Sequence, residues 1–342
     1  MHVPDGFIDA PISAATGMVA AGAIAVSLRG ARRELDERTA PLAGLVAAFI
    51  FAVQMLNFPV AAGTSGHLLG GALAAILVGP YTGVLCVSVV LLMQGILFAD
   101  GGLTALGVNI TDMAITTTVV AYAVFRGLVK ILPRSRRSIT AASFVAALLS
   151  VPAAALVFTL LYALGGTTDV SLGKVATAMI GVHVLIGIGE AAITALTVGA
   201  VIAVRPDLVH GARGLEQRLK LRVDGELVDA PRPLEPVAAT SRRKLWIGGL
   251  LASLVLAGFV SFYASSNPDG LEKVAADQGI DRQTKEHASA DSPLADYGVR
   301  DVEDARLSGG LAGVIGVGVT VVAGTGVFWA VRRRRSTSSQ VA

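Results

Sequence analysis

The first two residues of the chain, Met1 and His2, place three nitrogen atoms within reach of one metal ion. These are the free amino group of Met1, the peptide nitrogen of His2 and the Nδ1 atom of its imidazole. Together they close two fused chelate rings and fill three corners of a square, which leaves the fourth corner for another residue. Square-planar nitrogen ligation suits Ni(II) or Cu(II) better than the ions that prefer oxygen. The alternative is that His2 belongs to an N-terminal tail without a ligand role, and its position alone does not decide between the two.

A second histidine, His67, is a candidate for the fourth nitrogen. It follows a glycine-flanked loop, Gly63 to Gly66, that can bend back into the protein. Irregular backbone of this kind is tolerated at membrane depth only where it is buried or lines a cavity. The alternative is a histidine that caps a helix at the membrane interface.

Five further residues are candidates for a supporting role. His183 and Glu190 are two helical turns apart, so they lie on one face of a helix, separated by about 10 Å. Ionisable groups inside a bilayer usually face the bundle interior or a partner, so this pair either passes metal inward or anchors helix packing. Carboxylates often hold a ligating imidazole in place. Asp112, Asp5 and Asn57 are equal candidates for that role.

The motifs of common enzymes are missing from the sequence. The pair Gly173-Lys174 lacks the glycine spacing and the following Ser or Thr of a nucleotide-binding loop. No Ser/His/Asp or Cys/His arrangement suggests covalent catalysis. The single cysteine, Cys86, lies in an apolar run and excludes a disulfide framework. We therefore expect no enzyme, and any ATP hydrolysis that drives the protein must occur on another chain.

The composition is that of a membrane protein. Of the 342 residues 53% are hydrophobic and 15% are charged, whereas a soluble domain has about 25% charged residues. A bilayer span needs about 20 apolar residues, and one apolar stretch, 67–80, is short enough to be tilted or a half-span. The sequence predicts nine spans, at about 11–28, 41–58, 67–80, 81–98, 108–127, 139–163, 176–204, 245–264 and 309–331.

Positive charge is concentrated on one side of this arrangement. If the spans alternate, 22 of the 28 Lys and Arg residues fall on one side, in segments 29–40, 126–138, 205–244 and 332–335. Cytoplasmic loops carry an excess of Lys and Arg. The charge distribution therefore predicts a plasma-membrane protein with its N-terminus outside and its C-terminus in the cytoplasm.

The chain divides at a segment rich in Pro and charge. Residues 206–244 are expected to form a cytoplasmic linker between a seven-span part, 1–205, and a two-span part, 245–342. The two spans of the second part flank an external loop, 265–308, with ten acidic residues against five basic ones. An acidic outer loop raises the local cation concentration, although a loop that is merely soluble explains the same charge.

Three long motifs resemble the CbiM/NikM family, the substrate-binding components of energy-coupling-factor transporters for cobalt and nickel. They are MHVPDGFID, AAFIFAVQMLNFPVAAGTSGHLLGGALAAILVGP and FADGGLTALGVNITDMA. The resemblance extends over about residues 1–205. It implies an all-α membrane bundle of about seven helices, with a metal site made by the N-terminal amine, the backbone nitrogen and side chain of His2, and His67 of the TSGH motif.

A second resemblance lies in the external loop. Asn267-Pro268-Asp269-Gly270-Leu271-Glu272 is similar to the PDGLE domain, which resembles the small CbiN/NikN accessory component with its two spans around an outer loop. The chain thus resembles a fusion of the two components.

The function expected from these features is capture of Ni2+ or Co2+ from outside, as the substrate of an ATP-driven importer. The resemblance implies a transmembrane coupling component and ABC-type ATPase subunits as partners, and it involves no nucleic acid. An ATP-independent metal permease and a membrane metal sensor or scaffold are the alternatives. A planar four-nitrogen site favours Ni(II) over Co(II) in the order of divalent affinities, but the sequence does not choose between the two ions.

Overall fold

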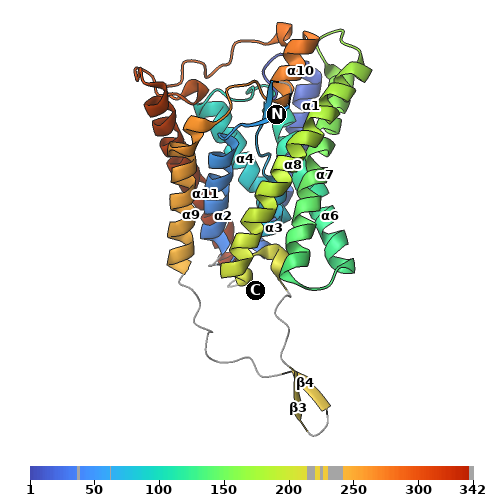
Figure 1. The fold of residues 1–342 in the computed structure, drawn as a ribbon, viewed down its shortest axis with the longest axis vertical. Helices are drawn as coiled ribbons and strands as arrows, with labels where there is room; N and C mark the ends of the chain where they lie inside the picture. Colours follow the sequence, from blue (N-terminus) through green and yellow to red (C-terminus); the bar gives the residue numbers. More distant parts are fainter. Residues whose placement is uncertain (37–38, 62, 214–219, 224–225, 230–241, 339–342) are drawn as a thin grey trace.

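The structure, a computed structural model, describes residues 1–36, 39–61, 63–213, 220–223, 226–229 and 242–338. It is helical throughout its bulk, with two small antiparallel hairpins (Figure 1). The hairpins pair β1 (Phe58–Ala61) with β2 (Thr64–Gly66) and β3 (Lys220–Val223) with β4 (Glu226–Asp229). The helices of the first part are α1 (Ala10–Glu34), α2 (Thr39–Gln54), α3 (Gly71–Val78), α4 (Pro80–Leu97), α5 (Leu106–Asn109), the π-helix η1 (Ile110–Thr116), α6 (Thr117–Ile131), α7 (Arg136–Gly165) and α8 (Leu172–Val204).

The rest of the chain begins with two 3₁₀ turns in the segment 206–244 and ends in a long helix. Its elements are η2 (Pro206–Leu208), η3 (His210–Ala212), α9 (Arg242–Gly258), η4 (Val260–Tyr263), α10 (Gly270–Gln278), η5 (Asp281–Gln283), η6 (Ala295–Tyr297) and α11 (Ala305–Ser338).

The expected all-α integral membrane fold is confirmed. Among the described residues, seven helices are long and apolar enough to cross a bilayer. They are α1, α4, the continuous run Leu106–Ile131, α7, α8, Arg243–Tyr263 and Ala305–Arg333. The predicted span 41–58 corresponds to α2, which has 16 residues and ends at Gln54, because the chain turns into the β1–β2 hairpin at Phe58.

The predicted span at 67–80 contains only a short helix. Residues His67 to Gly70 are not helical, and α3 has eight residues, which is about 12 Å at 1.5 Å per residue. Gly70 precedes α3 with a φ of 91°, a left-handed conformation that glycine adopts without strain. The Glu190 carboxylate accepts hydrogen bonds from the amides of Leu69 and Gly70 at 2.5 and 3.0 Å. The amides before α3 are therefore satisfied without a longer helix, and the segment is a half-span.

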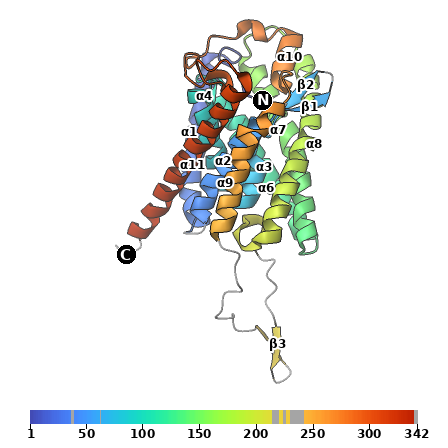
Figure 2. The ribbon, with the colours of Figure 1, turned by 60° about the vertical axis from the view of Figure 1, so that its left-hand side comes forward.

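The two parts of the chain pack as one bundle rather than as separate bodies. Helices α9 and α11 lie against α2 (Figures 1 and 2). Their contact depends on small residues, since a Cβ atom on Gly44 of α2 would lie 2.3 Å from Thr325 Oγ1 of α11. Small residues let membrane helices approach closely.

The loop between α9 and α11 covers the end of the bundle that holds the N-terminus, while α11 ends on the opposite side (Figure 1). Backbone hydrogen bonds tie this loop to three connections of the first part. Ser265 N donates to Asn57 O, Lys285 N to Asp5 O and Asp296 N to Phe98 O, at 2.7, 2.9 and 2.9 Å. The loop between α9 and α11 is thus a cover fixed over the N-terminal segment.

Candidate metal centre

The N-terminal segment is buried and held by its backbone, so it is not a free tail. Met1 is 2% exposed and Val3 is fully buried. Val3 N donates to Asn109 Oδ1 at 2.7 Å, and Asn109 Nδ2 donates back to Val3 O at 3.1 Å. Gly102 N also donates to Val3 O. These bonds fix the backbone one residue beyond His2 and hence the direction of the first two residues.

Asp5 fixes the same segment to the loop that follows α4. Its carboxylate accepts hydrogen bonds from the amides of Leu103 and Thr104 and from the Thr104 hydroxyl. Gly102 allows this close approach, because a Cβ there would lie 2.3 Å from Asp5 N. Asp5 therefore orients the N-terminal segment and contacts neither imidazole through these bonds.

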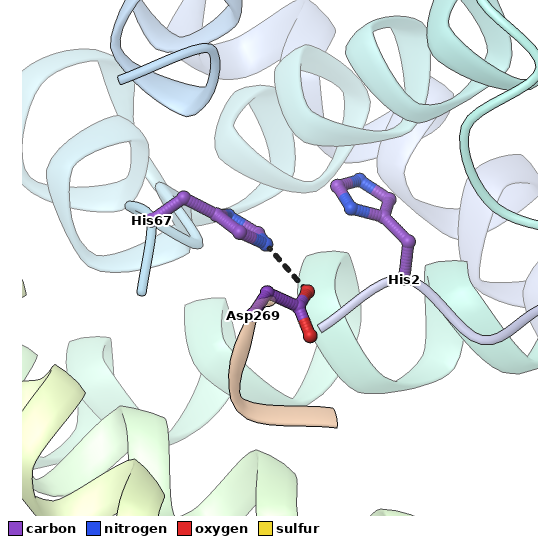
Figure 3. A group of neighbouring side chains, drawn as sticks. All are labelled: His2, His67 and Asp269. Carbon is purple, nitrogen blue, oxygen red and sulfur yellow. Dashed lines mark ion pairs between the residues drawn. The ribbon is translucent and has the colours of Figure 1, made fainter. Parts of the chain in front are cut away.

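The Met1 amine lies between His67 and an aspartate of the C-terminal part. Its nitrogen is 2.5 Å from His67 Nε2 and 2.6 Å from Asp269 Oδ2. Asp269 Oδ2 is 3.5 Å from His67 Nε2. Within the described residues, His2, His67 and Asp269 form a group whose ligand atoms all lie within 4.8 Å of one another (Figure 3). Three chain segments far apart in sequence therefore converge on one small volume.

The tautomer of His67 is set by its own loop. Its Nδ1 lies 2.9 Å from Leu68 O, a carbonyl that can only accept a hydrogen bond, so Nδ1 carries the proton. The lone pair of Nε2 then faces the Met1 amine. This is the tautomer that binds metal through Nε2.

His2 is held by two side chains of the α4 region. Its Nδ1 is 3.3 Å from Asp100 Oδ1, and its Nε2 is 3.1 Å from Gln94 Oε1. Its ring stacks on that of His67, with centroids 5.0 Å apart. Burial lowers the pKa of His2 to about 4, although nearby Asp100 opposes this shift. The imidazole is therefore neutral near pH 7, which is the form that ligates metals.

Asp269 is the site residue that the sequence interpretation missed. Its Oδ1 accepts from Glu272 N at 2.8 Å, and Glu272 Oε2 accepts from Asp269 N at 2.8 Å. This reciprocal pair caps α10 and leaves Oδ2 free for the amine. Burial acts to raise the pKa of Asp269, but the N-terminal ammonium opposes it, and the pKa lies well below its ordinary value.

A sequence signal for this residue was present in the PDGLE motif, where Asp followed three residues later by Glu is typical of a helix start. That signal predicts the cap. It carries no information on contact with a residue 268 positions earlier.

The remaining candidates lie around this centre without touching its imidazoles through any recorded bond. Asp112, on η1, is fully buried, and neither of its carboxylate oxygens has a hydrogen-bond partner among the described residues. His183 Nδ1 donates to Met179 O, and its Nε2 has no such partner in the described part of the chain. Glu190 anchors the backbone that follows His67. Asn57 lines the adjacent cavity.

A cavity of about 750 Å³ opens beside the centre and is lined by both parts of the chain. His2 and His67 contribute to its wall from the first part, and Asp269, Glu272 and His287 from the outer loop. Asp100 also lines it, and Tyr297 donates a hydrogen bond to Asp100 Oδ2 at 2.6 Å. The arrangement places nitrogen donors at the end of a chamber whose walls carry carboxylates, which suits a divalent cation.

Comparison with known proteins places the chain among membrane transport proteins for transition metals. A family model described as the cobalt uptake substrate-specific transmembrane region matches residues 2–208, and the PDGLE domain matches residues 243–333. A protein of Archaeoglobus fulgidus, provisionally named a fused nickel transport protein NikMN, is 39% identical over 70% of this chain and 82% of its own. The cobalt transport protein CbiM of Geobacter sulfurreducens is 32% identical over 82% of this chain and 79% of its own.

A solved structure supports this grouping. The crystal structure of a truncated transition metal transporter superposes with a TM-score of 0.53 at 27% identity, over 59% of this chain and 99% of that one. The family match extends over more than half of the chain and includes His2 and His67. The chain therefore belongs to the CbiM family, as a multi-pass membrane component of cobalt or nickel transport that is not an enzyme, and it ends in a PDGLE domain.

Proposed function

We propose that the chain captures Ni2+ or Co2+ at its N-terminus as the substrate-binding subunit of an ATP-driven importer. The ion is held by the Met1 amine, the peptide nitrogen and Nδ1 of His2, and His67 Nε2. The observation that carries this proposal is the 2.5 Å approach of the amine to His67 Nε2, at a residue whose Nδ1 is already engaged by Leu68 O. Two nitrogens of a square site thus face each other from segments 66 residues apart.

Chelation requires one local change at His2. In the structure its Nδ1 faces Asp100, so the ring must exchange this carboxylate for the ion. Met1 and His2 lose protons as the ion binds, because amine and peptide nitrogens ligate only without them. Asp100 and Asp269 are the nearest carboxylates to these donors.

The proposal includes both nickel and cobalt as substrates. The relatives are named for one metal or the other. A planar site of four nitrogens favours Ni(II) by geometry, whereas a ligand from outside that plane reduces this preference.

The orientation and partners follow from charge and family. We place the N-terminus and the acidic loop 265–308 outside the cell, and the basic segments, including the linker 206–244, in the cytoplasm. The seven-span part, 1–205, binds the metal, and the two-span part, 245–342, covers the site. A transmembrane coupling subunit and separate ABC-type ATPases then drive release on the inner side.

Uptake of radioactive nickel or cobalt into proteoliposomes tests the proposed function. The chain is reconstituted with its coupling and ATPase subunits so that the ATPases face the vesicle lumen. These vesicles should accumulate metal only when ATP is enclosed in the lumen. A His67→Ala variant should lose this uptake while the ATPases stay active. Accumulation by the chain alone would favour a permease. Metal binding without uptake in the full complex would favour a sensor or scaffold.

A further inference from the structure

We propose that a basic pocket at the end of the bundle opposite the metal centre binds the phosphate of an anionic phospholipid. The pocket lies between the end of α6, the start of α7 and the turn η3, and its volume is about 340 Å³. The loop that joins α6 to α7 is at the end of the bundle away from the N-terminus (Figure 1). This inference goes beyond the proposed function, because it involves neither the metal ion nor its ligands.

Four basic residues from two segments far apart in the sequence line this pocket. They are Arg126, Lys130, Arg134 and Arg213. All four are exposed, and none takes part in an ion pair recorded for the described residues. No acidic side chain is among the described residues that line the pocket. The pocket therefore has a concentrated positive charge that its own wall does not compensate.

Glu34 is an acidic residue near this cluster, but its carboxylate is used elsewhere. It accepts hydrogen bonds from the backbone amides of Tyr81 and Thr82 at the start of α4. Arg213 contacts Glu34 through the backbone, since Arg213 Nη2 donates to Glu34 O at 3.3 Å. That contact is to a neutral carbonyl, so it leaves the charge of the guanidinium available to an anion.

Helix α7 adds to the positive field of the pocket. Ser138 and Ile139, in its first turn, are part of the pocket wall. The amino end of a helix carries a partial positive charge and favours anions. The helix dipole therefore acts in the same direction as the four basic side chains.

The wall of the pocket also has an apolar side, which favours a lipid over a small anion. Val129, Leu132 and Ile139 line it together with the basic residues. Ile131, the last residue of α6, is 78% exposed, as expected where a membrane-spanning helix contacts lipid. A phospholipid has a phosphate next to apolar chains, and basic pockets between spans on the cytoplasmic side bind such headgroups.

A bound phosphate would connect two parts of the chain. Gly211 of η3 packs on α6, since a Cβ there would lie 2.7 Å from Phe125 Cζ. An anion between Arg126 and Arg213 joins α6 to the start of the segment 206–244. The lipid would thus fix the beginning of the linker against the bundle.

Native mass spectrometry of the full-length chain in detergent measures this binding. The chain is titrated with phosphatidylglycerol and, separately, with zwitterionic phosphatidylcholine, and inorganic phosphate is then added as a competitor. The parent should bind phosphatidylglycerol more tightly than phosphatidylcholine. Millimolar phosphate should not displace the lipid, because phosphate has no apolar chains to occupy the apolar side of the pocket.

The double variant Arg126→Gln/Arg134→Gln removes two charges from the pocket. Its apparent affinity for phosphatidylglycerol should fall by about thirtyfold, or about fivefold for each basic side chain. The matched control is Arg136→Gln/Arg137→Gln, which removes two exposed charges from the same end of the bundle at residues that do not line the pocket. The control should bind the lipid as the parent does.

Thermal unfolding in phosphatidylcholine micelles shows whether each variant is folded. If the double variant has no cooperative transition, Lys130→Gln alone should lower the affinity by about fivefold. Three results would overturn the inference: equal binding of the two lipids by the parent, equal losses in the pocket and control variants, and displacement of the lipid by phosphate. The second would assign lipid binding to the general charge of this end, and the third would make free phosphate the ligand.

Discussion

Residues Met1 and His67 meet because neighbouring hydrogen bonds fix each of them, and the Met1 amine lies 2.5 Å from His67 Nε2. Val3 is tied to Asn109 on both its amide and its carbonyl, and His67 uses Nδ1 on the neighbouring carbonyl. The donors therefore need no large rearrangement to share an ion. This preorganisation is the physical basis for expecting tight binding, since little conformational freedom remains to be lost.

At the residue scale, acid should destabilise the protein through His2. Burial lowers the pKa of His2 to about 4, while an unfolded histidine titrates near 6.5. Between these values the unfolded chain binds a proton that the folded chain does not, so stability falls as pH falls. The contribution is fully present above about pH 6.5 and is lost toward pH 4. Thermal unfolding across this range should show a smaller acid loss in His2→Asn than in the parent, and equal slopes would contradict this assignment.

The sequence pointed to His2 and His67 as candidates but not to Asp269 or Asp100, which lie beside them in the structure. His2 lies next to a terminal amine that can chelate a metal, and His67 follows a glycine-flanked loop. Both signals are local in the sequence, so they can be read without the fold. Asp269 and Asp100 are contacts made by tertiary packing. Asp112, another candidate from the sequence, has no hydrogen-bond partner for its carboxylate among the described residues. The position of a carboxylate in the sequence does not specify where it points in the fold.

At the level of elements, α8 holds in place the non-helical residues His67–Gly70 that precede α3. The Glu190 carboxylate accepts hydrogen bonds from two successive backbone amides, those of Leu69 and Gly70. These residues directly follow the His67–Leu68 unit. Movement of α8 along its axis would therefore move the ligand loop.

Glu190→Gln tests this anchor. The substituted amide can accept from one backbone N–H, but its NH2 group opposes the other, and an unsatisfied buried donor costs about 1–3 kcal/mol. We expect a lower melting temperature and weaker Ni(II) binding. Glu303→Gln, at an exposed residue of the outer loop, should leave both unchanged. A Glu190→Gln protein with the parent's melting temperature and affinity would contradict the anchor.

The packing of α11 on α9 gives a second test at this scale. A Cβ on Gly313 would lie 2.3 Å from Ala257 O of α9, whereas one on Gly318 of the same helix would meet nothing within 4 Å. Gly313→Leu should destabilise the protein by about 1–3 kcal/mol, the usual cost of overpacking. Gly318→Leu should be close to neutral. Thermal unfolding in detergent measures both, and equal effects would show that this contact does not hold α11 in place.

Spans were the most predictable elements and their ends the least. Hydrophobic runs located the long helices, because about 20 apolar residues have few other uses. The end of α2 at Gln54 and the β1–β2 hairpin were not predicted. The hairpin region makes hydrogen bonds to the loop between α9 and α11, such as Ser265 N to Asn57 O, which the local sequence pattern does not contain.

For the whole molecule, metal capture from outside requires the N-terminus and the loop 265–308 to lie outside the cell and the basic loops to lie in the cytoplasm. Ala288→Cys, in the outer loop, should react with a membrane-impermeant maleimide on intact cells. Arg134→Cys, between α6 and α7, should react only after permeabilisation. Both positions are exposed. The native Cys86 is fully buried, so the parent should remain unlabelled. Labelling of position 134 alone on intact cells would reverse the orientation.

In the proposed site the terminal amine itself holds the metal, and calorimetric titration with Ni(II) measures this role. Two forms of the full-length chain are compared, one with a free Met1 amine and one in which that amine is acetylated. Because the amine of Met1 lies 2.5 Å from His67 Nε2, acetylation converts that donor into an amide. We predict one tightly bound ion per chain for the free terminus and loss of this binding for the acetylated one. Equal affinity in the two forms would contradict the account.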